Sequence, residues 1–214
     1  NHIKPGEKMN VIVGDNGQGK TNLLECIWMF NGVKSFRGSK DRELVRFNEK
    51  FSEIEVDFFS EERLQNARLE FVNGHREAYL NDVKKPAPSH LMGKITSIVF
   101  SPEHLSLVKG GPSVRRKFID SAICQVKPKY SAYLARYNKI LNQRNALLKD
   151  ISYYSELTDT LEIWDKELAL AGSVIISERL KYISELSAVA GEYHRGISES
   201  REALQLAYTG KYSD

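Results

Sequence analysis

Eight consecutive residues near the start of the chain have the spacing of a loop that holds nucleotide phosphates. Residues 14–21 read G-D-N-G-Q-G-K-T and fit the pattern G-x-x-x-x-G-K-[ST] at every fixed position. Glycine permits backbone angles that other residues resist, so successive N–H groups can point at anionic oxygens. Lys20 would reach the β- and γ-phosphates as the catalytic cation, and the Thr21 hydroxyl would ligate Mg²⁺. The predicted nucleotide-binding residues are Gly14, Asp15, Asn16, Gly17, Gln18, Gly19, Lys20, Thr21 and Asn22.

This loop occurs in kinases, GTPases, helicases, transporters and DNA-repair ATPases. The residues around it narrow the class of protein. The stretch N-G-Q-G-K-T-N-L-L-E, residues 16–25, resembles the ATPase heads of chromosome-maintenance and double-strand-repair proteins, which are relatives of the ABC ATPases. Two further stretches resemble the bacterial RecF family of DNA replication and repair proteins. They are S-F-R-G-S-K-D-R-E-L-V, residues 35–45, and F-S-P-E-H-L-S-L-V-K-G-G-P-S-V-R-R-K-F-I-D, residues 100–120.

The resemblance implies further site residues in these two stretches. In related heads an arginine at the position of Arg37 lies near the γ-phosphate or DNA, which makes Arg37 a candidate ligand for ATP; a solvated loop charge is the alternative. Related heads place a Mg²⁺-binding glutamine where this chain has Ser101-Pro102-Glu103. Glu103 is therefore a candidate metal contact in place of that glutamine. The alternative is a helix start, with Ser101 as the cap and Pro102 in the first turn.

A basic segment follows the second of these stretches. Residues 109–149 hold ten basic side chains and one acidic one, a net charge of +9, whereas residues 150–214 have a net charge of −6. Arg115, Arg116 and Lys117 open this segment and are candidate DNA contacts, because cations at a helix start oppose the helix dipole. A solvated face, or ion pairing with the acidic half, is the alternative. Three nearby tyrosines at positions 130, 133 and 137 could stack on bases, but their spacing favours core packing.

The hydrophobic pattern places these motifs on a two-part chain. A buried strand at 11–13 leads into the loop, and a helix at about 20–30 follows it with Leu23, Leu24, Ile27 and Trp28 on its apolar side. Alternation at 54–58 and the turn signal Asn73-Gly74 predict a small antiparallel sheet between about residues 52 and 81. A second buried strand is expected at 95–100.

Heptad-like spacing dominates the rest of the chain. Apolar residues recur at steps of 3 and 4 from Tyr130 to Leu148, with Arg144 in one slot, and again from Leu157 to Ile175. A helix at 113–126 and an antiparallel helical hairpin are expected. We therefore predict an α/β fold: a partial ABC/SMC-like ATPase head with a small antiparallel sheet in residues 1–110, and a helical-hairpin lobe in residues 111–214.

Two elements of an ABC-type head are missing from the sequence. The S-x-G-Q signature loop and the apolar strand ending in Asp-Glu are both absent, and in the RecF family they come later than residue 214. The chain also begins at Asn1 rather than Met. We therefore expect a piece of a longer protein, which by itself hydrolyses little or no ATP, whereas the full-length protein would be a slow DNA-dependent ATPase.

The resemblance implies a protein of DNA replication, recombination, repair and the SOS response. It would bind ATP and Mg²⁺, form a homodimer around ATP, bind single-stranded, gapped or junction DNA, and assist recombinase loading with mediator proteins. A small-molecule kinase and an ABC transporter subunit are the alternatives. With 41% hydrophobic residues, no signal peptide and no apolar run long enough to span a membrane, we expect a cytoplasmic protein. Its two cysteines, Cys26 and Cys124, are expected to be reduced core residues.

Overall fold

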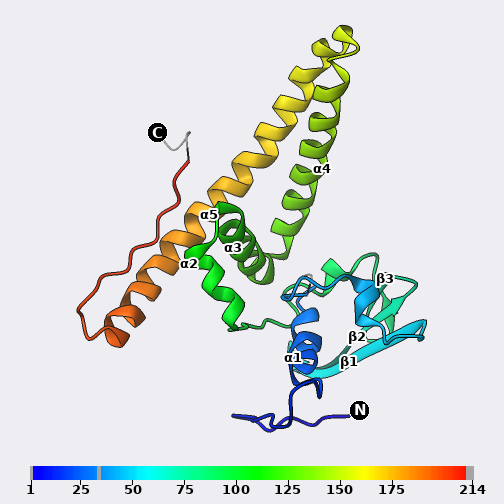
Figure 1. The fold of residues 1–214 in the computed structure, drawn as a ribbon, viewed down its shortest axis with the longest axis vertical. Coiled ribbons are helices and arrows are strands. Elements are labelled where there is room, and N and C mark those ends of the chain that lie inside the picture. The colour runs from blue at the N-terminus through cyan, green and yellow to red at the C-terminus, as the bar shows by residue number, and fades with distance from the viewer. Residues whose placement is uncertain (1, 33–34, 211–214) are drawn as a thin grey trace. The chain divides into compact units, whose positions relative to one another are not determined.

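The computed structural model describes residues 2–32 and 35–210. The chain forms two compact units, residues 1–99 and residues 100–214 (Figure 1). The first unit carries the phosphate loop and the sheet, and the second consists of helices. The phosphate loop therefore lies in the first unit, whereas Glu103 and the candidate DNA contacts lie in the second.

An antiparallel sheet forms the frame of the first unit. Its strands lie in the order β1 (Phe51–Ser60), β2 (Arg63–Val72), β3 (His75–Leu80) and β4 (Val83–Lys84). Asn73 and Gly74 join β2 to β3 with φ angles of 51° and 77°, and positive φ at both turn residues suits the twist of a two-residue hairpin. The predicted small antiparallel sheet is confirmed.

The core of this unit joins the sheet to the phosphate-loop helix, α1 (Lys20–Met29). Alternate residues of β2 point to one face, where Ala67, Leu69 and Phe71 are buried. Met29 and Phe30, at the C-terminal end of α1, belong to the same buried cluster. Burial of these side chains anchors one end of α1 and leaves its N-terminal end to carry the loop.

The buried side of α1 differs from the predicted one. The fully buried residues of the helix are Glu25 and Met29, whereas Leu24 and Ile27 are 47% and 49% exposed. Positions 25 and 29 are one helical turn apart, so they share the face that meets the sheet. The prediction followed the apolar residues, but the contact with the sheet selects a face that includes a carboxylate.

The predicted strands at 11–13 and 95–100 are not present. Neither segment pairs with another strand within the described residues, and a β-strand is held by hydrogen bonds to a neighbour. Val13 and Ile98 are accordingly 86% and 97% exposed. Two single turns of 3₁₀ helix, η1 (Asp41–Leu44) and η2 (Pro88–Leu91), complete the unit.

The second unit is a helical lobe that begins with η3 (Pro102–Leu105), α2 (Ser106–Lys109) and α3 (Pro112–Val126). The helices α4 (Pro128–Asp150) and α5 (Leu161–Ile197) lie side by side as a hairpin, with η4 (Ser155–Thr160) in the connection (Figure 1). The predicted helical hairpin is confirmed. Within the described residues, no helix has the length and apolarity needed to cross a membrane.

A buried ion pair joins the helices of this lobe. The Asp120 carboxylate on α3 accepts two hydrogen bonds from Arg179 on α5, both 2.8 Å long, and one of 2.6 Å from the Tyr130 hydroxyl on α4. Arg179 also donates to the hydroxyl of Tyr208, at 3.3 Å. The side chains of Asp120 and Arg179 are only 12% and 11% exposed, so three helices meet at one nearly dry carboxylate. Burial and this carboxylate both raise the pKa of Tyr130, which stays a donor.

Both cysteines are free thiols; Cys124 is buried, as predicted, whereas Cys26 is only partly buried rather than a core residue. Burial raises the pKa of Cys26, and it raises the pKa of Cys124 to about 11, with the Asp120 charge adding to the effect. Both side chains are therefore protonated at neutral pH and are poor nucleophiles.

The ion pair gives a stability prediction. Asp120→Asn leaves the Arg179 guanidinium buried without its counter-charge, so we expect the free energy of unfolding to fall by about 3–5 kcal/mol. Urea unfolding followed by far-ultraviolet circular dichroism measures this loss. Asp165→Asn, which removes an exposed carboxylate paired with Arg144, is the matched control and should leave the midpoint nearly unchanged. Equal midpoints for the two variants would contradict the organising role of Asp120.

Candidate nucleotide-binding site

The phosphate loop has backbone angles that require glycine. Gly17 and Gly19 have φ angles of 83° and 86°, in the left-handed region, and Gly19 is the N-cap of α1. A Cβ added at Gly14, Gly17 or Gly19 would meet no atom within 4 Å. The glycines at these three positions are therefore not required by packing within the described part of the chain.

The start of α1 offers donors and positive charge. No side chain caps this helix end and its first turn contains no acidic residue, so the first-turn N–H groups carry the positive end of the dipole. The Lys20 ammonium lies across the loop and donates to the carbonyl oxygens of Gly14, at 2.7 Å, and Asp15, at 2.6 Å. Thr21 is exposed on the same turn. These groups fit a nucleotide with Mg²⁺: Lys20 and the loop N–H groups would hold phosphate oxygens, and Thr21 the metal.

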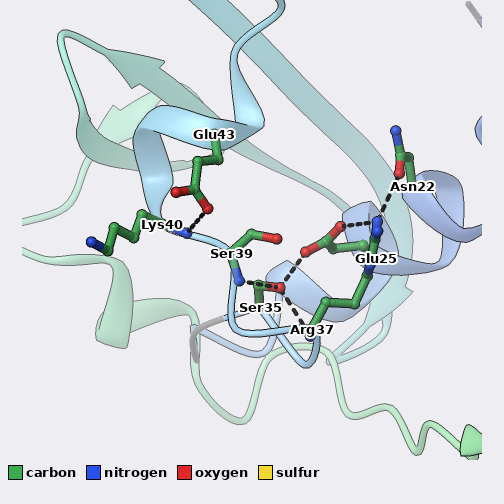
Figure 2. Close-up of polar contacts among 7 residues, drawn as sticks. All are labelled: Asn22, Glu25, Ser35, Arg37, Ser39, Lys40 and Glu43. Carbon is green, nitrogen blue, oxygen red and sulfur yellow. Dashed lines mark hydrogen bonds and ion pairs between the residues drawn. The ribbon is translucent and has the colours of Figure 1, made fainter. Parts of the chain in front are cut away.

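Arg37 is held beside this turn by a polar network that the sequence did not reveal (Figure 2). Its Nη1 donates to Asn22 Oδ1 at 3.0 Å and lies 3.4 Å from Glu25 Oε2. Glu25 is buried, and its other oxygen accepts a hydrogen bond from the Ser35 hydroxyl. Arg37 is thus paired with groups of α1 although its side chain is 44% exposed, and its role as a ligand for ATP stays a prediction. The one feature of the sequence that could have indicated a buried Glu25 is its place as a single acid in the apolar run L-L-E-C-I-W-M, residues 23–29.

A cavity of about 510 Å³ opens next to this network. Asn22, Glu25, Cys26 and Met29 of α1 line one side, and Arg37 contributes to the wall. The remaining lining residues come from the following loop and the sheet: Ser39, Glu43, Leu44, Val45, Arg46, Ser52, Ile54 and Phe71. The network therefore borders open space on the α1 face that carries Glu25.

Glu103, the candidate metal contact, lies in η3 of the second unit and is exposed. Ser101 precedes this turn, and Pro102 is its first residue. The Ser101 N–H donates to Nδ1 of His104 at 3.0 Å. The alternative interpretation of this stretch, a helix start with Pro102 in the first turn, describes its local structure. A role of Glu103 at the metal stays a prediction.

The three candidate DNA contacts, all on α3, differ in their surroundings. Arg115 donates from Nη1 to the carbonyl oxygens of Gly110, at 2.7 Å, and Leu107, at 3.3 Å. It thus satisfies carbonyls left open where α2 ends. Arg116 and Lys117 are exposed, and no hydrogen bond or ion pair engages either side chain within the described residues. Arg116 and Lys117 are therefore better placed than Arg115 to meet an external anion.

Ion pairs with acids of α5 engage some of the basic side chains of segment 109–149. Their partners are Lys127 with Glu178, Arg136 with Glu167, and Arg144 with Asp165. Three of the ten basic residues of segment 109–149 are thus paired with the acidic half of the hairpin. Tyr130 is buried, as core packing predicts, whereas Tyr133 is 43% exposed.

Comparison with known proteins first defines the class. A family model described as an AAA domain matches residues 1–204. The chain belongs to this AAA domain family, which agrees with its phosphate loop and the helix that follows.

Curated relatives of this chain include the DNA replication and repair protein RecF of several bacteria. The DNA replication and repair protein RecF of Agathobacter rectalis is 39% identical over 208 residues, which are 96% of this chain and 57% of that protein. RecF of Bacillus cereus is 37% identical over 203 residues, 94% of this chain and 54% of its own length. The predicted resemblance to the N-terminal part of RecF is confirmed. The chain spans about half the length of these curated relatives.

Solved structures give the same result. A structure titled as the recombination mediator protein RecF with ATP in the RecFOR pathway matches with a TM-score of 0.80 and 35% identity, over 86% of this chain and 50% of that one. A companion RecF structure, titled with ATPrS, has a TM-score of 0.81 and covers 87% and 51%. The predicted fold class, a partial ATPase head with a helical lobe, is confirmed. These similarities favour RecF over the kinase and transporter alternatives.

Proposed function

We propose that this chain binds ATP at residues 14–21 as the N-terminal part of a RecF-type DNA repair protein. The observation that carries the proposal is the loop itself: it combines left-handed glycines, an uncapped helix start and the Lys20 ammonium, which lies across the loop. Similarity to a RecF structure titled with ATP supports the choice of nucleotide.

The chemistry of the site follows from charge. A triphosphate brings several negative charges, which the Lys20 ammonium and the N-terminal end of α1 offset. Lys20 now donates to two loop carbonyls, so it is already oriented toward the loop interior. Mg²⁺ would neutralise further phosphate charge, with the Thr21 hydroxyl as its ligand.

For the whole protein we propose the activity implied by the family. It would form a homodimer around ATP, bind single-stranded, gapped or junction DNA, and assist recombinase loading with mediator proteins, as a slow ATPase. This chain lacks the signature loop and the Asp-Glu strand in its sequence, so it should hold ATP with little turnover. Arg116 and Lys117 on α3 are the proposed DNA contacts, because they are exposed cations outside the hairpin ion pairs.

The nucleotide proposal is tested by Lys20→Ala. Losing a charge-assisted contact with phosphate should weaken binding of a fluorescent ATP analogue by about tenfold or more in the presence of Mg²⁺. Lys50→Ala, which removes an exposed lysine ahead of β1, is the matched control and should bind like the unchanged chain. Equal affinity for both variants would refute the assignment of the loop. EDTA should weaken binding as well if Mg²⁺ bridges Thr21 and the phosphates.

The DNA proposal is tested by reversing charge on α3. The double variant Arg116→Glu/Lys117→Glu should bind a fluorescent single-stranded oligonucleotide more weakly. The slope of log affinity against log salt should shrink by about 1.4, or about 0.7 for each lost phosphate contact. Lys181→Glu, an exposed lysine of the acidic helix α5, is the control. An unchanged slope in the double variant would remove this face from the DNA-binding surface.

A further inference from the structure

Glu25 lies where a carboxylate is costly. The residue is 4% exposed, on the face of α1 that also buries Met29. A buried carboxylate loses its hydration, and hydrophobic residues of similar size at such positions are often neutral or stabilising. Packing alone therefore gives no reason for an acid here, and the reason must come from the groups that the carboxylate holds.

The first of these groups is the loop after α1. The Ser35 hydroxyl donates to Glu25 Oε1 and accepts hydrogen bonds from the backbone N–H groups of Arg37, at 3.1 Å, and Ser39, at 3.3 Å (Figure 2). A serine hydroxyl has one donor and two acceptor sites, so all of its capacity is used. The chain turns around this oxygen at Ser35–Ser39, with Gly38 at a φ of 81°. Through Ser35, the Glu25 carboxylate fixes where this turn lies.

The second group is the Arg37 guanidinium. It bonds to Asn22 in the first turn of α1 and is drawn to Glu25 one turn further along the helix. Asn22 follows Thr21 directly, so the guanidinium lies beside the turn that ends the phosphate loop. The Arg37 side chain is 44% exposed, so part of it faces solvent while Glu25 is only 5% exposed. The guanidinium is therefore bound to the residue that directly follows Thr21, the predicted Mg²⁺ ligand.

We propose that Glu25 is a positioning residue that sets the discrimination between nucleoside triphosphate and diphosphate. Its carboxylate fixes both the Ser35–Ser39 turn and the Arg37 guanidinium, and so presents Arg37 to the terminal phosphate. This inference rests on the proposed nucleotide-binding function and goes beyond it, because it assigns selectivity to a residue outside the loop. The phosphate of DNA is the other anion that Arg37 could meet. The bonds of Arg37 to α1 favour the nucleotide.

The test compares the affinity of the chain for ATP and for ADP, each measured with Mg²⁺ by displacement of a fluorescent nucleotide. Glu25→Gln keeps the size of the side chain and removes the charge that holds Arg37. Its ATP affinity should fall about tenfold while its ADP affinity stays within about twofold, as expected for one lost charge-assisted contact. Arg37→Ala should have the same effect, and the double variant should lose no more than either single variant, because the residues act as a unit.

The controls separate this role from structural support. Glu43→Gln changes another acid of the same segment, one that accepts a hydrogen bond from the Lys40 N–H, and should leave the ATP-to-ADP ratio unchanged. Glu25→Asp should recover part of the selectivity because it restores the charge. Ser35→Ala loosens the turn while keeping the carboxylate, so it should lower the ratio even where Glu25→Gln fails to fold.

Three results would overturn the inference. The first is an unchanged ATP-to-ADP ratio in Glu25→Gln, and the second is an equal loss of affinity for ATP and ADP; either outcome reduces Glu25 to a structural role. A third is a change in binding to a single-stranded oligonucleotide, with no change in the nucleotide ratio, which would assign Arg37 to DNA. In each case Lys20→Ala still reports on the loop, so failure of this inference is distinguishable from failure of the proposed function.

Discussion

A carboxylate that leaves water must gain donors, and this constraint organises both units of the chain. Glu25 and Asp120 are the two buried acids among the described residues. Asp120 gains three donors and thereby joins α3, α4 and α5. Glu25 gains Ser35 and Arg37 and thereby joins the loop at 35–39 to the phosphate-loop helix. In each unit the polar contact specifies an arrangement that apolar packing alone would leave free to slide.

Local sequence information predicted the elements that depend on local interactions. The turn Asn73-Gly74 sets the β2–β3 register within a few residues, and heptad spacing commits both hairpin helices to one shared face. The strands predicted at 11–13 and 95–100 failed for the opposite reason. β-branched composition gives a segment the propensity to pair, but the partner must come from elsewhere in the fold. The phosphate loop was predictable because its chemistry fixes both residue type and spacing. The Glu25 network was not, since it depends on side-chain directions across 12 residues.

The helical lobe shows why the net charge of a segment overstates its binding surface. Residues 109–149 have a net charge of +9, yet Lys127, Arg136 and Arg144 pair with acids of α5, and Arg115 satisfies carbonyls at the end of α2. The single acid of residues 109–149 is the buried Asp120. Part of the opposite charge on the two halves of the hairpin therefore forms ion pairs within it, as charged pairs between coiled-coil helices do. The cations left over are the ones to consider for DNA.

The two ends of α1 have different roles in nucleotide binding. Its C-terminal end is fixed because Met29 and Phe30 belong to the core of the sheet. Its N-terminal end must stay uncapped, because a capping side chain would take the N–H groups that phosphate needs. Glu25 lies between the two ends, one turn from each of Thr21 and Met29. It holds the Arg37 guanidinium, which also contacts Asn22 near the N-terminal end. An acid in the first turn would weaken anion binding directly. One turn further along the helix and buried, the same charge can hold an arginine beside the site without facing the phosphates itself.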